Sequence, residues 1–273
     1  MMGEQQEFSS LTGYADDPLV TGVTMALIVM GGLGFLVWHD LVRHRKWEKF
    51  SVHTKLVLVM TGILLAAGTV LFFLLESGNP RTLGGLPLGQ RVLAALFQSV
   101  TCRTAGFVTI DQTALTNASV LISLLLMFIG GSPGSTGGGI KTTAAALLAL
   151  AALSVLRGKR DITVFRRRID NRAVLHALTV CMVAAMLIFV GTLLLCVSDG
   201  VSIELALYET VSAFSTTGST QNLTPTLGTA SRLWLIVEMY LGRVGIMTLG
   251  VAVFLRRVSE QKIRYPEGRV MIG

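Results

Sequence analysis

Residues 97–107 read FQSVTCRTAGF, and residues 209–219 read ETVSAFSTTGS. The two stretches align without a gap at an offset of 112 positions, and in both a short amphipathic segment leads into a Thr-x-Gly turn. Internal similarity at a fixed offset is typical of a repeated structural unit. The aligned pairs are Thr104 with Thr216 and Gly106 with Gly218.

A second motif repeats at the same offset. Gly130-Gly-Ser-Pro falls on Gly242-Arg-Val-Gly, so each glycine site begins 24 residues after the glycine of its Thr-x-Gly turn. A partial third copy, Gly31-Gly-Leu-Gly, has the same form, and counting back from it places the end of its turn motif at Phe8. We therefore expect the unit to be a span, a short re-entrant helix, a turn and a second span. The chain is expected to begin just after the turn of an earlier copy.

The composition predicts an integral membrane protein. Of the 273 residues, 52% are hydrophobic and 14% are charged, and the mean hydropathy is +0.66. Soluble domains carry about 25% charged residues, and disordered chains have the opposite composition. The three cysteines are too scattered for a disulfide framework or a metal site, so we expect free thiols. They are Cys102, Cys181 and Cys196.

Five segments are apolar over the length of about 20 residues that a membrane span needs. The third is longer than one span and is interrupted by glycines. Two amphipathic segments, at about 88–101 and 202–214, are too short to cross. The expected spans are 18–38, 54–75, 114–156, 173–198 and 229–255.

The distribution of basic residues predicts the orientation of the chain in the membrane. Seventeen of the 23 Lys and Arg residues lie in the stretches 43–55, 157–172 and 256–269, which the positive-inside rule places in the cytoplasm. We interpret the run Arg166-Arg-Arg as a loop that faces lipid headgroups, not nucleic acid. The four histidines near these ends are read as interfacial, without a metal role. They are His39, His44, His53 and His176.

The repeated turns favour cation coordination. Irregular backbone at membrane depth must lie in protein or beside water, and glycine relaxes the limits on φ that would prevent carbonyls from turning to a pore axis. Rings of carbonyls replace the hydration shell of a cation, and the C-terminus of the preceding helix adds partial negative charge. The ion implied is monovalent, because no carboxylate cluster could hold Ca²⁺ or Mg²⁺. The predicted filter residues are Thr104, Ala105, Gly106, Phe107, Thr216, Thr217, Gly218 and Ser219.

The stretch GGSPGSTGGGIKTT, at 130–143, is not a Walker A motif, because Ile140 separates Gly139 from Lys141 and an apolar helix precedes it. Its glycines and proline cannot remain helical, so the span is broken. We interpret it as an intramembrane gate beneath the filter; the alternative is a helix kink that serves packing. The gate residues are Gly130, Gly131, Ser132, Pro133, Gly134, Gly137, Gly138, Gly139, Lys141 and Arg243.

Two arginines lie at membrane depth. Arg243 is flanked by glycines within a span, where a charge must face a cavity or a partner. It either raises a barrier for cations in the cavity or forms a buried pair with Glu238 or Glu209. Arg103, beside the first turn, is expected to buttress that turn by hydrogen bonds.

These motifs resemble the Trk/Ktr/HKT superfamily of potassium transporters, and the bacterial Ktr/Trk membrane subunit in particular. The resemblance implies four M1–P–M2 repeats around one K⁺ channel-like pore, with K⁺ held by filter carbonyls alone. It also implies a gate in the second helix of the third repeat and an arginine barrier in the fourth. The motifs are TCRTAGF (101–107), FIGGSPGSTGGGIKTT (128–143), SAFSTTGS (212–219), YLGRVGIMTLG (240–250) and MGGLGFLVWHDL (30–41).

The resemblance further implies a homodimer in the cytoplasmic membrane, seated on a cytosolic ring of nucleotide-binding regulatory subunits, with Na⁺ or H⁺ as a coupling ion. No cofactor or nucleic acid is expected. In these terms the fold is an all-α membrane protein with five transmembrane helices and two re-entrant pore helices. The expected divisions are the end of a second repeat (1–53), a third repeat with a broken M2 (54–156), a basic cytoplasmic loop (157–172), a fourth repeat (173–255) and a cytoplasmic tail (256–273).

Two of the family's four filters are absent from this sequence. We expect a truncated gene product, inactive alone; the alternative is that several copies assemble to complete four filters. The other functions considered are a channel or carrier for Na⁺ or ammonium, and a membrane enzyme. An enzyme is not expected, because no nucleophile–base pair lies at membrane depth.

Overall fold

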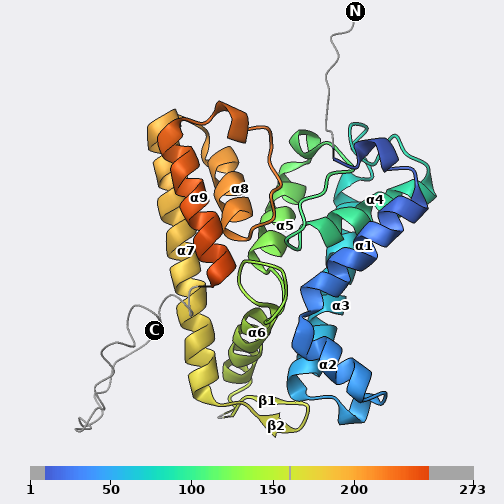
Figure 1. Cartoon of the computed structure of the whole chain (residues 1–273), viewed down its shortest axis with the longest axis vertical. Helices are drawn as coiled ribbons and strands as arrows, with labels where there is room; N and C mark the ends of the chain where they lie inside the picture. Colours follow the sequence, from blue (N-terminus) through green and yellow to red (C-terminus); the bar gives the residue numbers. More distant parts are fainter. Residues whose placement is uncertain (1–9, 160, 246–273) are drawn as a thin grey trace, which may run out of the picture.

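The computed structural model describes residues 10–159 and 161–245. These residues form helices and one short antiparallel ribbon (Figure 1). The helices are α1 (Pro18–Leu33), α2 (Phe35–Arg43), α3 (Val52–Glu76), α4 (Leu88–Thr101), α5 (Asn117–Phe128), α6 (Thr142–Leu156), α7 (Asn171–Asp199), α8 (Ile203–Phe214) and α9 (Thr229–Val244). The ribbon strands are β1 (Thr163–Val164) and β2 (Arg167–Arg168), and single 3-10 turns lie at Thr12–Tyr14, Trp47–Lys49, Gln112–Ala114 and Thr224–Thr226.

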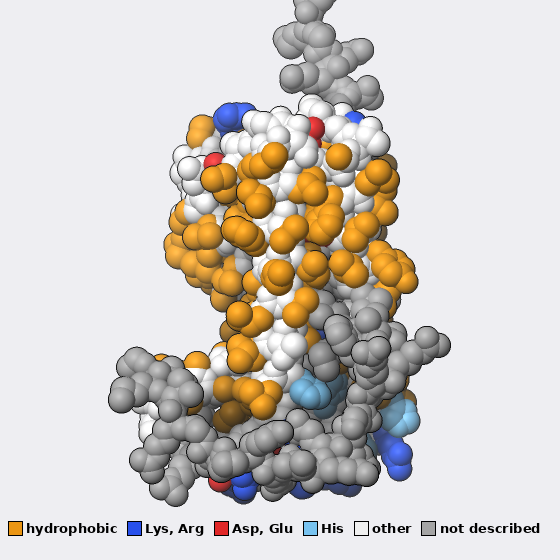
Figure 2. Space-filling view, turned by 90° about the vertical axis from the view of Figure 1, so that its left-hand side faces the viewer, with side chains coloured by type: hydrophobic (Ala, Val, Ile, Leu, Met, Phe, Trp, Pro, Cys, Tyr) orange, Lys and Arg blue, Asp and Glu red, His pale blue; other side chains and the backbone are white. Residues whose placement is uncertain are grey.

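Two of the described helices, α3 and α7, are long and apolar enough to cross a membrane, with 25 and 29 residues. The bent pair α1 and α2 makes a third if it is one span. Figure 2 shows hydrophobic side chains spread over the flank of the molecule, with Lys and Arg towards its two ends. A soluble monomer seldom exposes so large an apolar surface. The chain is therefore a mainly helical membrane protein, as its composition predicts.

The segment 18–38 is not the single straight helix that the sequence predicts. α1 ends at Leu33, Gly34 has a φ of 87°, and the axes of α1 and α2 differ by 94°. At the bend, the backbone of Gly34 lies close to the backbone of Pro133 and Gly134, and a Cβ at Gly34 would collide with them. Hydropathy cannot predict this bend, because the obstructing segment lies about a hundred residues further along the chain.

The segment 114–156 is divided, as its glycines predict. α5 starts behind the Thr116 cap, whose hydroxyl accepts from the Ser119 amide at 3.3 Å. The chain leaves helical geometry after Phe128 and resumes it at Thr142. The intervening residues form a loop at the centre of the molecule (Figure 1). The last expected span is described only to residue 245, so its remainder, the tail 256–273 and Phe8 lie outside the described residues.

The two short amphipathic segments form α4 and α8, within one residue of the predicted bounds. The C-terminal parts of both helices are buried, and large core side chains such as Phe97, Tyr208 and Phe214 lie on them. Because these ends lie inside the protein, the two Thr-x-Gly turns that follow them also begin inside it.

Candidate functional site

The two Thr-x-Gly turns share one unusual backbone conformation. The φ angles are 64° at Thr104 and 71° at Gly106, and 55° at Thr216 and 83° at Gly218. A β-branched residue seldom adopts positive φ, and such strain persists only where the surroundings impose it. The same strained threonine at both equivalent positions indicates that the fold constrains the two turns in the same way.

Amide groups of both turns donate hydrogen bonds. The carbonyl of Phe107, a predicted filter residue, is occupied as well, because it accepts from the Thr101 hydroxyl at 2.7 Å. The N–H groups of Ala105 and Gly106 each donate to the Thr101 carbonyl at 3.2 Å, and that of Thr217 donates to the Ser212 carbonyl at 2.9 Å. Within residues 10–159 and 161–245, no hydrogen bond reaches the carbonyl oxygens of residues 104–106 or 216–218. These oxygens therefore have no hydrogen-bond donor in the described part of the chain.

The structure brings the two turns into contact. A Cβ added at Gly106 would overlap the Thr217 carbonyl oxygen and would lie 3.1 Å from the carbonyl carbon of Gly218. Any side chain at position 106 would therefore push the turns apart. Of the other predicted residues, Ser219 is 7% exposed and Phe107 is 43% exposed.

The glycine-rich loop lies directly against both turns. A Cβ at Gly137 would meet the Thr104 hydroxyl at 2.5 Å, and one at Gly138 would collide with the hydroxyl of Thr216. Gly130 likewise faces the Thr104 methyl group and the Gly138 carbonyl. The predicted filter and gate residues thus form one contiguous region, and the small size of the glycines permits it.

The loop is hydrogen-bonded to the bend between α1 and α2. Ser132 N donates to the Gly32 carbonyl at 3.0 Å, Thr136 N to the Gly31 carbonyl at 3.2 Å, and Phe35 N to the Gly134 carbonyl at 3.1 Å. Within the loop, Lys141 Nζ donates to the Gly137 carbonyl at 2.7 Å. The partial copy of the glycine motif near the start of the chain is therefore a docking surface for the loop.

Arg243 reaches the same loop from α9, where its guanidinium Nη1 donates to the Thr136 carbonyl. The alternative of an ion pair with Glu238 or Glu209 is not seen among the described residues. Glu238 accepts instead from Trp234 Nε1 at 3.0 Å, and Glu209 accepts from the Thr224 hydroxyl.

The expected role of Arg103 requires correction. Its Nη2 lies 3.5 Å from the Thr61 hydroxyl on α3, and among the described residues its Nε has no partner and its side chain makes no hydrogen bond to the turn. The residue as a whole is 7% exposed. Because α3 packs beside α4, Thr61 on α3 lies within hydrogen-bonding distance of the Arg103 side chain. The spacing of residues around Arg103 in the sequence does not reveal this tertiary contact.

Sequence reasoning missed Glu76, the last residue of α3. Its carboxylate is fully buried and accepts from Thr116 N at 2.9 Å, Thr116 Oγ1 at 2.8 Å, Thr82 Oγ1 at 2.5 Å and Asn79 Nδ2 at 2.8 Å. These bonds join the end of α3 to the loop before α4 and to the N-terminus of α5. The only sequence signal was an acidic residue at the end of an apolar run, which resembles an ordinary span boundary.

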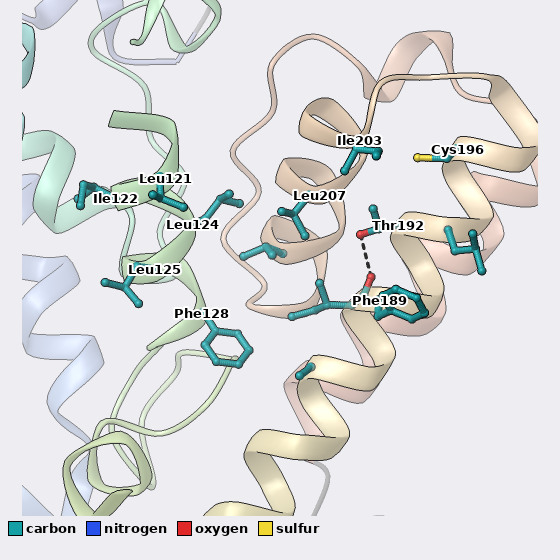
Figure 3. Close-up of a pocket in the computed structure, with 14 residues that line it drawn as sticks. Leu121, Ile122, Leu124, Leu125, Phe128, Phe189, Thr192, Cys196, Ile203 and Leu207 are labelled. Carbon is teal, nitrogen blue, oxygen red and sulfur yellow. Dashed lines mark hydrogen bonds between the residues drawn. The ribbon is translucent and has the colours of Figure 1, made fainter. Parts of the chain in front are cut away.

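A groove of about 850 Å³ lies between α5, α7 and α8, away from the turns (Figure 3). Its lining is almost entirely apolar, and the one hydroxyl that enters it, on Thr192, is already bonded to Ile188 O and Thr210 Oγ1. Such a groove offers no ligands to an ion. Elsewhere in the described residues, no group of three or more His, Cys, Asp or Glu side chains could hold a metal.

The strained turns, their free carbonyls and the glycine loop accompany a clear family match. The sequence profile of the TrkH family, described as cation transport proteins, matches residues 6–263. This chain belongs to the TrkH family. The match covers the residues of both turns and of the loop.

Named relatives and a solved structure agree with this membership. The chain is 40% identical to "Ktr system potassium uptake protein B" of Vibrio alginolyticus, over 97% of this chain and 58% of that protein. It is 39% identical to the protein of the same name from Bacillus subtilis, over 97% and 59% of the two chains. It is 38% identical to "Potassium/sodium uptake protein NtpJ" of Enterococcus hirae, over 92% and 56%.

The crystal structure of the potassium transporter TrkH from Vibrio parahaemolyticus has the same fold. The TM-score is 0.73 at 21% identity, over 90% of this chain and 54% of that one. This TrkH-family chain spans between half and three fifths of the length of these relatives.

Proposed function

We propose that this TrkH-family chain contributes to potassium uptake across the cytoplasmic membrane. Three relatives named for potassium uptake are 38–40% identical to it over more than nine tenths of its length. The observation that carries the proposal is the pair of turns whose carbonyl oxygens, at residues 104–106 and 216–218, accept no hydrogen bond from any described residue. Carbonyl groups in this setting replace the water shell of a monovalent cation.

The backbone of the turns supports this chemistry. Thr104 and Gly106 both have positive φ, and positive φ at alternate residues is a conformation that allows successive carbonyls to turn towards one side. The C-terminal ends of α4 and α8 precede the turns, and their partial negative charge favours a cation there. K⁺ is the proposed cargo, held by backbone oxygens alone.

The glycine-rich loop is the proposed gate. It lies against Thr104 and Thr216, and the hydrogen bonds of Lys141 and Arg243 hold it in that place. Opening the path requires the loop to move away from the turns, which breaks these bonds. Both side chains also place positive charge beside the path, which opposes a cation until the loop moves.

In the four-repeat arrangement that the resemblance implies, two turns make half of a ring, so a complete pore requires two more. We propose that they come from a preceding part of the same protein, or from further copies of this chain. A homodimer with a cytosolic ring of nucleotide-binding subunits is the assembly proposed from the resemblance, and Na⁺ or H⁺ is the proposed coupling ion.

The test is growth at low potassium of a host that lacks its own K⁺ uptake. The chain is expressed alone and together with any coding sequence that precedes it in its gene, each with and without the nucleotide-binding subunit. Rescue by the chain alone would show that turns from several copies assemble. Rescue only by the extended protein would assign this chain to the second half of a four-repeat transporter. Protein present in the membrane without rescue in any arm would contradict the proposal.

A further inference from the structure

A buried hydrogen-bonded network joins the two repeats behind the turns. Its centre is the side-chain amide of Gln112, in the 3-10 turn that follows the first Thr-x-Gly motif. The Gln112 amide and that of Gln98 on α4 bond to each other in both directions, at 2.9 and 3.1 Å. The Gln112 oxygen also accepts from the Tyr208 hydroxyl on α8 at 3.3 Å.

The network ends at the second turn. The Tyr208 hydroxyl lies 2.9 Å from the hydroxyl of Ser219, the residue after Gly218. Because Tyr208 donates its one proton to Gln112, the Ser219 hydroxyl must be the donor in this second bond. A continuous path therefore runs from α4 through Gln112 and Tyr208 to the end of the second turn.

Every hydrogen-bonding site of the Gln112 amide is used. Its oxygen accepts two bonds, and its nitrogen donates to the Gln98 oxygen and to the Ile110 carbonyl, the latter at 2.9 Å. The Gln112 backbone carbonyl also accepts from Gln221 Nε2 at 3.3 Å. A fully satisfied polar network specifies one arrangement of the groups it joins.

The network is inside the protein. Gln98 is 1% exposed, Gln112 is 2% exposed and Tyr208 is fully buried. Burying polar groups costs free energy that only complete bonding offsets. An apolar core of the same shape would hold the helices together without fixing the register between the turns.

We infer that the bridge formed by Gln98, Gln112, Tyr208 and Ser219 positions the two turns relative to each other and thereby sets the ion preference of the pore. The inference rests on the proposed function. Discrimination between cations depends on the positions of the coordinating carbonyls. Gln112 and Tyr208 act as positioning residues, because they reach the ion path only through Ser219.

The test is Tyr208→Phe in the full-length protein, which removes one hydroxyl and keeps the ring. Tyr240→Phe is the matched control, because Tyr240 is 62% exposed on α9 and belongs to no part of the bridge. Uptake of K⁺, Rb⁺, Na⁺ and ammonium is measured in competition, together with thermal stability. Ser219→Ala removes the last bond of the same path.

We expect the preference for the favoured ion to fall by about three- to tenfold in Tyr208→Phe, the ratio that one lost hydrogen bond corresponds to. Ser219→Ala should change the preference in the same direction, and Tyr240→Phe should not change it. Unchanged ion ratios in Tyr208→Phe, even with lower thermal stability, would overturn the inference and leave the proposed function intact. A wild type that prefers Na⁺ or ammonium would instead contradict the proposed function, and a shifted ratio in Tyr208→Phe would still support the bridge.

Discussion

Thr104 and Thr216 lie 112 positions apart, have φ angles of 64° and 55°, and contact the consecutive glycines Gly137 and Gly138. Two turns from different copies of the sequence motif thus rest on adjacent residues of one loop. Because the glycines have no Cβ, the threonines pack directly against the loop backbone. A movement of the loop therefore changes the contacts of both turns together. This relationship links the proposed filter to the proposed gate.

In the form of the protein that rescues growth at low potassium, Gly106→Ala should abolish the rescue. A Cβ there overlaps the Thr217 carbonyl, and the positive φ of 71° adds strain of about 1–3 kcal/mol. Gly62→Ala on α3 is the control, because a Cβ there meets nothing within 4 Å. Equal rescue by the two variants would contradict a role for the first turn in the ion path.

Arg243→Gln should raise basal K⁺ uptake several-fold. The change removes a positive charge and weakens the bond that ties α9 to the Thr136 carbonyl. Arg232→Gln serves as the control, since Arg232 also lies on α9 and donates to a backbone carbonyl, that of Pro225, at an exposed site. Uptake of ⁸⁶Rb⁺ into cells gives the rates. A fall in uptake at normal protein level would show that Arg243 supports conduction, against the gate proposal.

Gly34→Ala should displace the glycine loop from its docking surface. The residue has a φ of 87° and its Cβ would collide with the Pro133 carbonyl, so we expect a loss of about 1–3 kcal/mol of stability. Gly32→Ala, two residues earlier in α1, meets nothing within 4 Å. Thermal unfolding in detergent compares the two variants, and a Gly34→Ala protein as stable as Gly32→Ala would disprove the docking.

Glu76→Gln should destabilise the protein by about 2 kcal/mol, because an amide replaces an oxygen that accepts charge-assisted hydrogen bonds. The NH₂ group of the glutamine replaces one of the two carboxylate oxygens. It then faces either the donors of Thr116 or those of Thr82 and Asn79, and it cannot accept their hydrogen bonds. Glu204→Gln, in the exposed first turn of α8, is the control. The midpoint of thermal unfolding should fall for Glu76→Gln alone. Similar midpoints would mean that the carboxylate charge is not needed there.

Much of the architecture could be predicted from local patterns. The lengths of the apolar runs predicted α3 and α7, amphipathic spacing predicted α4 and α8, and the glycines at 130–139 predicted the break between α5 and α6. Each of these depends on residues a few positions apart. The roles of the filter and gate residues remain predictions.

What the sequence by itself determined is the membrane class, the repeat and the residues that recur in it, because hydropathy and turn chemistry act locally. Only the tertiary structure decided the bend at Gly34, the contact of Arg103 with Thr61, the bonds around Glu76 and the bridge through Gln112. In each case the partner lies on another element, up to about a hundred residues away. A buried polar side chain bonds to whichever donor or acceptor the packing brings within reach, and sequence distance does not encode that choice.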